Sequence, residues 1–143
     1  MTIVNSTINN VYGGGNEAKM IENTYVKISS SIIQNSAYAG GKGATATVMG
    51  DSTIIIDGAT EIKENVFGGG NAAMTGTEES PSNCKVYIYG GTIGKDVYGG
   101  ANTSVVYGNT YVVIGKENKK IPNVILNNIN TIGCGIKSKL EMY

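Results

Sequence analysis

Apolar residues occupy alternate positions in four short segments of this chain, and the four segments match one another. In segments 25–28, 53–56, 85–88 and 111–114 the second and fourth residues are Val or Ile, whereas the first and third vary among Tyr, Lys, Thr, Ile and Val. Alternation with a period of two is typical of a strand that buries one face. We therefore predict four β-strands whose second and fourth side chains enter a core.

Further landmarks recur at regular distances from these strands. Aromatic residues stand at Tyr12, Tyr38, Phe67 and Tyr98, with spacings of 26, 29 and 31 residues, and an isoleucine lies five positions before each of the last three. Polar residues suited to tight turns separate these landmarks. The repeating unit is therefore three short strands joined by three corners, and no segment has the period of an amphipathic helix.

A unit of this size cannot bury its own apolar face, whereas stacked units can. Equivalent Val and Ile side chains then form ladders along an inner column, and successive units pair at about 4.8 Å. The period and the unequal strand spacing favour a right-handed parallel β-helix, because a left-handed solenoid would show a hexapeptide repeat. We predict an all-β fold, a β-solenoid of about four to five coils, in a single domain that spans residues 1–143.

Each aromatic landmark lies in a glycine-rich run. The runs are VYGGGN at 11–16, VFGGGN at 66–71 and VYGGAN at 97–102, with a weaker copy, AYAGGK, at 37–42. Glycine accepts a positive φ or a close approach of the next coil, so we expect a corner that recurs in every coil. Asparagine also tolerates a positive φ, and stacked asparagines can form a hydrogen-bond ladder. The asparagines concerned are Asn16, Asn71 and Asn102.

Two regions depart from the repeat. Residues 75–83 are predicted to leave the stack as a longer loop, and the last coil, 116–143, is irregular. The chain also opens in mid-repeat, at residues 2–8. Because the ends of a solenoid expose unpaired strand edges, we expect association there, either as a homo-oligomer or by end-to-end stacking with neighbouring coils.

The composition argues against several classes of protein. The chain has 11 acidic residues and 11 basic ones, all of them Lys, so its net charge is zero, and it has no His. Without a basic surface, nucleic-acid binding is not expected. No apolar run approaches the ~18 residues of a membrane helix, and the N-terminus lacks the pattern of a signal peptide. If the protein acts outside a cell, this stretch is part of a longer chain or is exported without that signal.

The two cysteines, Cys84 and Cys134, are too few for a disulfide scaffold and lack the spacing of a metal site. Free cysteine usually packs as a small hydrophobe, so we expect inert, partly buried thiols. Whether the two cysteines pair with each other stays open.

The glycine-rich runs and their flanking strands resemble the Asn-Val-Phe-Gly-Gly-Gly-Asn-Ala-Ala type repeats of very large adhesin-like surface proteins of gut bacteria. The match lies at residues 65–73, continues through the following strand to the turn at 90–93, and covers about residues 7–115 in all. The resemblance implies a pectin-lyase-like right-handed β-helix that acts as a stalk or display surface, and it implies no activity. The chain is shorter than those proteins, which leaves open whether it is a fragment or a complete small protein.

An enzymatic function is one possibility for this fold, because right-handed β-helices include polysaccharide lyases and glycosidases. Lyases of this fold use Ca²⁺ held by clustered Asp, and glycosidases need a close pair of carboxylates. Here Asp51, Asp57 and Asp96 map to different corners of different coils, and Asp57 and Glu61 flank one turn. In the absence of His, no nucleophile has a base beside it. We therefore predict no enzyme, and no catalytic, cofactor-binding or metal-binding residues.

Aromatic and aliphatic side chains that point outward from the predicted strands form a candidate interaction surface. Tyr can stack on sugar rings or anchor a protein interface, although it also favours exposed strands through its propensity alone. Ile55, Tyr87 and Val113 share one column with Lys27 at its end, and a mostly apolar stripe of this kind can pack against another solenoid. The predicted surface comprises Tyr25, Ile55, Tyr87, Tyr89, Tyr111 and Val113.

These observations favour a non-enzymatic structural and interaction module of an extracellular, adhesin-like bacterial surface protein, with a host glycan or protein as a possible partner. The alternative is a phage tail fibre, spike or other virion-surface protein that self-assembles. A third reading, a polysaccharide-degrading enzyme of the pectin-lyase-like fold, has less support. The location, cell surface or virion, depends on which of the first two readings holds.

Overall fold

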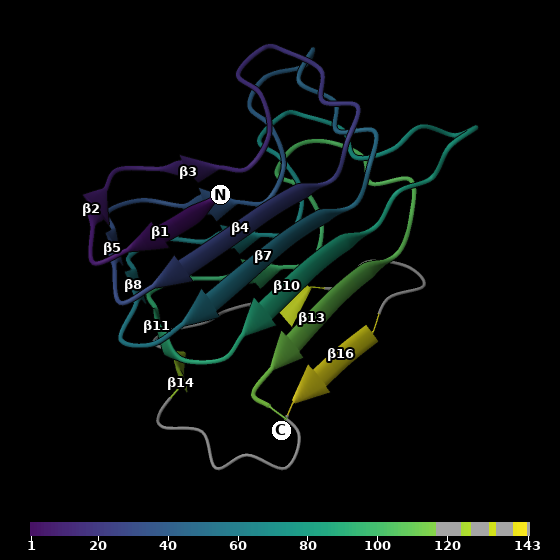
Figure 1. The fold of residues 1–143 in the computed structure, drawn as a ribbon. Coiled ribbons are helices and arrows are strands. Elements are labelled where there is room, and N and C mark those ends of the chain that lie inside the picture. The colour runs from purple at the N-terminus through teal and green to yellow at the C-terminus, as the bar shows by residue number, and fades with distance from the viewer. Residues whose placement is uncertain (117–123, 127–131, 134–138, 143) are drawn as a thin grey trace.

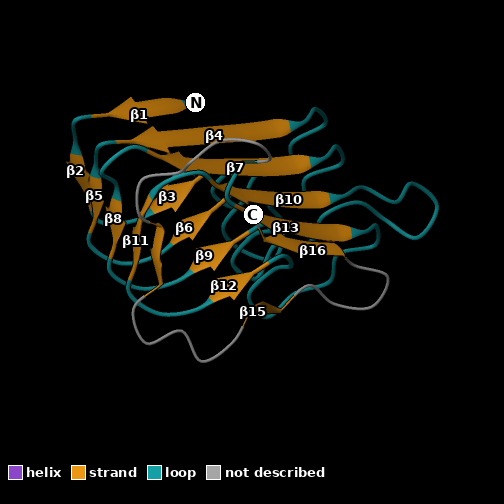
Figure 2. Cartoon of the chain, turned by 90° about the horizontal axis from the view of Figure 1, so that it is seen from below, coloured by secondary structure: helices purple, strands orange, loops and turns teal. Residues whose placement is uncertain are grey.

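The computed structural model describes residues 1–116, 124–126, 132–133 and 139–142, and it shows a chain wound into stacked coils (Figure 1). Each coil contributes one strand to each of three parallel sheets, named here A, B and C in chain order. The coils wind in a right-handed sense, and the described part of the chain contains no helix (Figures 1 and 2). The predicted all-β parallel β-helix is therefore confirmed.

Sheet A has the longest strands and faces the viewer in Figure 1. Its strands are β1 (Thr2–Val4), β4 (Thr24–Ser29), β7 (Ser52–Asp57), β10 (Cys84–Ile88), β13 (Thr110–Ile114) and β16 (Lys139–Met142). Sheet B consists of β2 (Thr7–Ile8), β5 (Ile32–Ile33), β8 (Glu61–Ile62), β11 (Gly91–Ile93) and β14 (Val124–Leu126). Sheet C consists of β3 (Val11–Tyr12), β6 (Ala37–Tyr38), β9 (Val66–Phe67), β12 (Val97–Tyr98) and β15 (Ile132–Gly133).

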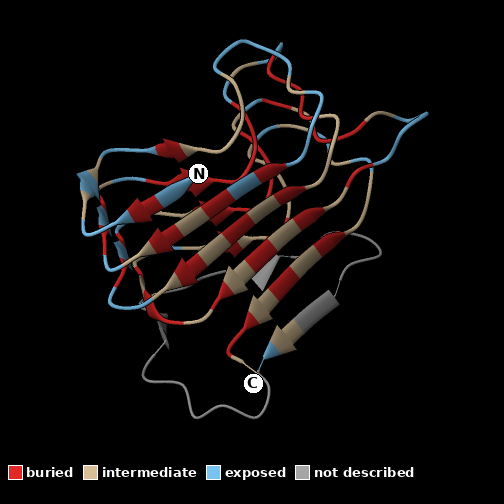
Figure 3. Cartoon of the chain, viewed as in Figure 1, coloured by how far each residue is buried: buried red, intermediate tan, exposed pale blue. Residues whose placement is uncertain are grey.

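The core lies between the three sheets and contains the Val and Ile residues that the alternation predicts. Along each central strand of sheet A, buried residues alternate with partly exposed ones (Figure 3). The buried Val and Ile residues of the sheet A strands β4, β7, β10 and β13 are Val26, Ile28, Ile54, Ile56, Val86, Ile88, Val112 and Ile114. Burial of one such side chain contributes roughly 1.5–3 kcal/mol, so these ladders are a principal source of stability.

Each coil also has a fourth side, which connects sheet C to sheet A of the next coil. Isolated bridges join the equivalent residues of successive coils there; these residues are Met20, Val48, Thr75 and Val106. Thr75 is fully buried, so the predicted loop at 75–83 is wrong at its first residue, which stays in the stack. Gly76 is also joined to the preceding coil, because its N–H donates to the Val48 carbonyl oxygen at 2.8 Å. The part of the loop that leaves the stack follows Gly76 and extends to the upper right in Figure 1.

The glycine-rich runs lead from sheet C into this fourth side, and close approach explains them. None of the glycines of these runs has a positive φ. Instead, a Cβ on Gly68 would lie 2.3 Å from the carbonyl oxygen of Gly99 in the next coil. The positive φ falls on the residue after the asparagine, with values of 53°, 56° and 55° at Glu17, Ala72 and Thr103. Of the two explanations that the sequence offered for these glycines, the close approach is therefore correct.

The predicted asparagine ladder is formed between Asn71 and Asn102, where Asn102 Nδ2 donates to Asn71 Oδ1 at 3.1 Å. Asn16 is not adjacent to Asn71, because Lys42 of the intervening coil is bridged to both. The prediction is thus confirmed for Asn71 and Asn102 and wrong for Asn16.

The four aromatic landmarks form a continuous stack along sheet C, on the face opposite to its buried Val and Ala residues. Ring centroids lie 4.9, 4.8 and 4.9 Å apart along the series Tyr12, Tyr38, Phe67 and Tyr98, and successive ring planes differ by 6°, 2° and 11°. The two middle rings, Tyr38 and Phe67, are only 6% and 5% exposed. This ring stack is therefore a second apolar column, outside the main core.

Candidate functional site

The structure brings the six predicted surface residues onto one face of the molecule, the outer face of sheet A. Each lies on a sheet A strand or directly after one, at positions that alternate with the buried core residues (Figure 3). We call this surface the tyrosine face. Its members are Tyr25, Ile55, Tyr87, Tyr89, Tyr111 and Val113.

Strand pairing arranges most of these residues in two columns. The first column contains Lys27, Ile55, Tyr87 and Val113, in the order that the sequence predicts. In the second column, Tyr25 and Tyr111 are separated by Thr53 and Lys85. The tyrosines of the face are therefore staggered over the two columns and do not continue from coil to coil.

Tyr89 follows β10 directly and extends the face toward sheet B. Its backbone N–H donates to the Ile56 carbonyl oxygen at 2.7 Å, which continues the pairing of β10 with β7. The Tyr89 ring lies 5.8 Å from that of Tyr87, and the two planes are tilted by 38°. Burial, and then the neighbouring Tyr87 and Tyr25, raise the pKa of Tyr89, so its hydroxyl group is a hydrogen-bond donor at neutral pH.

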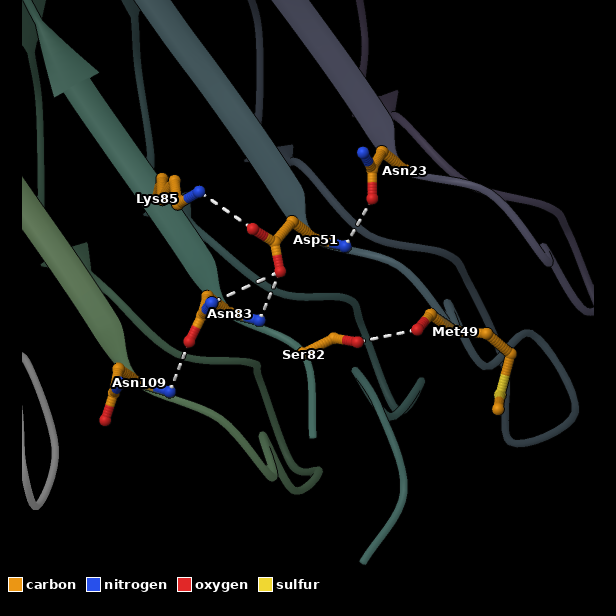
Figure 4. Close-up of polar contacts among 7 residues, drawn as sticks. All are labelled: Asn23, Met49, Asp51, Ser82, Asn83, Lys85 and Asn109. Atoms are coloured by element: carbon orange, nitrogen blue, oxygen red, sulfur yellow. Dashed lines mark hydrogen bonds and ion pairs between the residues drawn. The ribbon is translucent and has the colours of Figure 1, made fainter. Parts of the chain in front are cut away.

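Two ion pairs neutralise much of the charge beside the tyrosine face. Lys116 Nζ lies 4.5 Å from the centroid of the Tyr89 ring and 3.6 Å from Asp57 Oδ2. At the opposite border, Lys85 Nζ lies 2.8 Å from Asp51 Oδ2 (Figure 4). Neither pair follows from the alignment of the repeats, because in each pair the two residues lie at different positions of the repeat.

A ladder of polar side chains borders the face where the chain enters sheet A (Figure 4). The Asn23 side-chain oxygen accepts the backbone N–H of Asp51 at 2.8 Å. Asp51 Oδ1 accepts the N–H of Asn83 at 2.8 Å, and Asn83 Oδ1 accepts that of Asn109 at 2.9 Å. We call this the corner ladder. The corner ladder is not among the sequence-based predictions, although the sequence carries a signal for it: each member directly precedes the first residue of a sheet A strand.

Asp51 is the charged member of the corner ladder. Burial acts to raise the pKa of Asp51, but hydrogen bonds from Lys85 and from Asn83 outweigh burial and hold this pKa below its ordinary value. The hydrogen bond with Asp51 also raises the pKa of Lys85. Both groups are therefore charged at neutral pH, and they hold two neighbouring coils together beside the tyrosine face.

Cys84 occupies the first inward position of β10, on the opposite side of sheet A from the tyrosine face. It is fully buried, more so than the sequence predicted. Burial raises the pKa of its thiol to about 12, so the thiol stays protonated and unreactive, as expected. Cys134 lies outside the described residues, and its burial and its pairing with Cys84 stay open.

The described aspartates lie at separate places. Asp51 directly precedes β7 and Asp57 is the last residue of that strand, which corrects the prediction that they belong to different coils. They are six steps apart along an extended chain, which corresponds to about 20 Å. Asp96 belongs to the next coil, where its Oδ2 accepts the Tyr98 hydroxyl at 3.2 Å. Among the described residues, no group of three or more Cys, Asp or Glu side chains is placed to hold a metal ion.

Comparison with known proteins does not identify a relative. No family model matches the chain, and neither a curated protein nor a solved structure matches it significantly. Within the ranges that the structure describes, no helix is long and apolar enough to cross a membrane. The chain is therefore characterised by its fold and its surface: it is a parallel β-solenoid with a staggered tyrosine face.

Proposed function

We propose that the chain is a non-enzymatic structural and interaction module of an extracellular bacterial surface protein, in which it serves as a stalk or display surface. The observation that supports this proposal is the tyrosine face. Tyr25 is 48% exposed, and Ile55 and Val113 remain partly exposed near it. Clustered aromatic residues of this kind are typical of recognition surfaces. The resemblance of the glycine-rich runs to adhesin-like repeats supports the extracellular location.

The stacked architecture suits a stalk. Each coil lengthens the stack by about 4.8 Å, and the same sheets continue through every coil. The inner Val and Ile ladders, the ring stack and the corner ladder all run along the stack, so each coil is joined to the next at several places. Such a rod holds an outward surface at a fixed distance and orientation.

Antibodies against the purified chain test the proposed location. We expect them to label intact cells of the source organism without permeabilisation, and we expect external protease to remove the label. An antibody against a cytoplasmic protein is the matched control. Labelling that requires permeabilised cells would contradict an extracellular role.

A self-assembling fibre or virion-surface protein is the second candidate, and the first column of the face favours it. Ile55, Tyr87 and Val113 form a partly exposed stripe that a trimer would bury. Light scattering coupled to gel filtration distinguishes the two candidates. A stable trimer that Ile55→Lys dissociates would support the fibre, and a monomer would support the display module.

A further inference from the structure

We propose that the tyrosine face binds a neutral glycan chain. This inference rests on the proposed display function and specifies its ligand. Three features of the face point to this ligand class: the amphipathic character of its rings, the pairing of the charges beside it, and its small area.

The rings of the tyrosine face combine apolar surface with hydroxyl groups. A sugar ring carries C–H groups on its faces and hydroxyl groups around its edge, so it can pack against an aromatic ring while its hydroxyls exchange hydrogen bonds with phenols. Tyr87 and Tyr89 are both partly exposed, with ring centroids 5.8 Å apart and ring planes tilted by 38°. Lys116 Nζ lies over the Tyr89 ring, so Tyr87 is the ring of this pair that we expect to stack on a sugar. Tyr25 adds a third ring that is 48% exposed.

The charges beside the face argue against a strongly ionic ligand. Lys85 and Lys116 are paired with Asp51 and Asp57, so an ionic ligand would have to compete with these partners. The other charged residues of the first column, Lys27 and Glu141, stand at its two ends and are opposite in sign. Lys27 stands at the end of the first column, where its ammonium group can donate hydrogen bonds to hydroxyl oxygens. The face therefore favours an uncharged ligand that is rich in hydroxyl groups.

The six residues of the face are by themselves too small an area for a stable protein interface, which would have to extend onto the neighbouring strands β1 and β16. From Tyr25 to Tyr111 the face spans three strand spacings, about 14 Å, and from Lys85 to Tyr89 it spans four residues, about 13 Å. This footprint of roughly 200 Å² is well below the ~800 Å² that each partner of a stable complex buries. A linear glycan is narrow enough to bind along such a strip.

Strand pairing holds the rings in place before a ligand arrives. β10 is paired with β7 on one side and with β13 on the other, so the backbone of Tyr87 is fixed from both directions. Tyrosine loses little conformational entropy when it contacts a ligand, and a prearranged surface reduces the cost of binding further. Both effects favour a ligand that makes few contacts.

Isothermal titration of the full chain against a panel of oligosaccharides tests the proposal. The panel contains linear neutral oligomers of glucose, mannose and galactose, with polygalacturonate as the charged comparison. We expect at least one neutral series to bind, with little dependence on salt. Tyr25→Ala and Tyr87→Ala should each weaken that binding by about fivefold to tenfold. The matched control, Tyr107→Ala, removes a tyrosine that is 40% exposed next to the bridged fourth side, and it should leave binding unchanged.

Several results would overturn the glycan proposal. One is the absence of binding to every neutral oligosaccharide of the panel. Another is a loss of affinity in Tyr107→Ala equal to that in Tyr25→Ala and Tyr87→Ala. A third is binding of polygalacturonate alone, with a steep dependence on salt. An oligomer that Ile55→Lys dissociates would assign the face to self-association instead. Thermal unfolding of every variant shows whether it remains folded. The antibody experiment tests location independently, so a failure of glycan binding on surface-labelled cells would leave the display function standing.

Discussion

Aromatic residues project from both sheet A and sheet C, but the two sheets place them differently. In the ring stack, successive coils place a ring at the same register, with centroids 4.8 to 4.9 Å apart. Tyr38 and Phe67 are consequently almost fully covered. On the tyrosine face, non-aromatic residues separate Tyr25 from Tyr111, and the Tyr25 ring remains nearly half exposed.

The comparison shows that register decides what an aromatic residue does in this solenoid. The distance between coils is close to the stacking distance of aromatic rings, so a ring repeated in every coil is covered by its neighbours and stabilises the fold. A ring whose neighbours in the column are Thr or Lys is not stacked in this way. Tyr111, beside Lys85, stays partly exposed, and Tyr25 is 48% exposed because only Thr53 flanks it in the column: β1 pairs with β4 from Lys27 onward. In this solenoid, an interrupted aromatic column therefore indicates a surface available for binding, and a continuous aromatic column indicates an element that stabilises the fold.

Removing one ring from each region should give the largest contrast. Phe67→Ala leaves a cavity between Tyr38 and Tyr98, and we expect it to lower the free energy of unfolding by about 3–5 kcal/mol. Tyr25→Ala should lower it by less than about 1 kcal/mol, because about half of the side chain is already exposed to water. Urea denaturation of both variants measures the difference. Similar losses would show that the ring stack is no more important for stability than the tyrosine face.

The close contact between coils next to the ring stack should be the second most sensitive feature. Gly68→Ala places a methyl group against the Gly99 carbonyl oxygen, and we expect a loss of about 1–3 kcal/mol. Gly100→Ala is the matched control, since the nearest atom to its Cβ, Val106 Cγ2, lies at 4.0 Å. Denaturation midpoints of the two variants give the comparison. An equal effect of the two substitutions would mean that coil contact does not explain the glycine.

The corner ladder should make the sheet A side sensitive to acid. The pKa of Asp51 is lowered in the folded state, so its contribution to stability is present above the unfolded pKa of about 3.9 and is lost as the pH falls through the lower folded value. We expect the contribution to be below about 1 kcal/mol, because the pair with Lys85 is partly exposed. Denaturation of the wild type and of Asp51→Asn between pH 7 and about pH 2 tests this. Parallel curves for the two proteins would contradict it.

The smallest expected effect is an increase in stability on the sheet C side. Lys42→Asn would place an asparagine between Asn16 and Asn71 and complete the ladder that Lys42 interrupts. We expect a stabilisation of up to about 1 kcal/mol from the added hydrogen bonds. Lys42→Ala is the control, because it removes the contact of Lys42 with the Tyr12 ring and supplies no amide. No difference between the two variants in thermal unfolding would count against the ladder.

Much of the fold could be predicted because its determinants are local. The alternation of Val and Ile in a strand such as 53–56 sets its inward face whatever lies beside it, and the recurrence of that pattern is enough to infer stacked coils. The columns of the tyrosine face follow from the same alignment. Lys27, Ile55 and Tyr87 are therefore neighbours in the structure as the sequence predicts.

The features that could not be predicted depend on the geometry of the corners, for which the sequence gives no simple pattern. Whether Phe67 points into the core or away from it depends on how the chain bends at the next glycines. The buried position of Thr75 was missed because a threonine stands where the other coils have Val or Met. The pair of Lys116 with Asp57 joins residues two coils apart in the sequence, and no local pattern marks it.

The uniform sequence separation of the contacts between coils has a consequence for folding. The hydrogen bonds that join one coil to the next span 24 to 34 residues, at the start of the stack as well as further along it. Adding a coil therefore closes a loop of the same size each time, and the entropy cost of each closure stays constant as the chain grows. A stack of this kind can fold by adding one coil at a time to any coil already formed. Duplication of a single repeat would then lengthen the rod without making the new coil harder to fold than the existing ones.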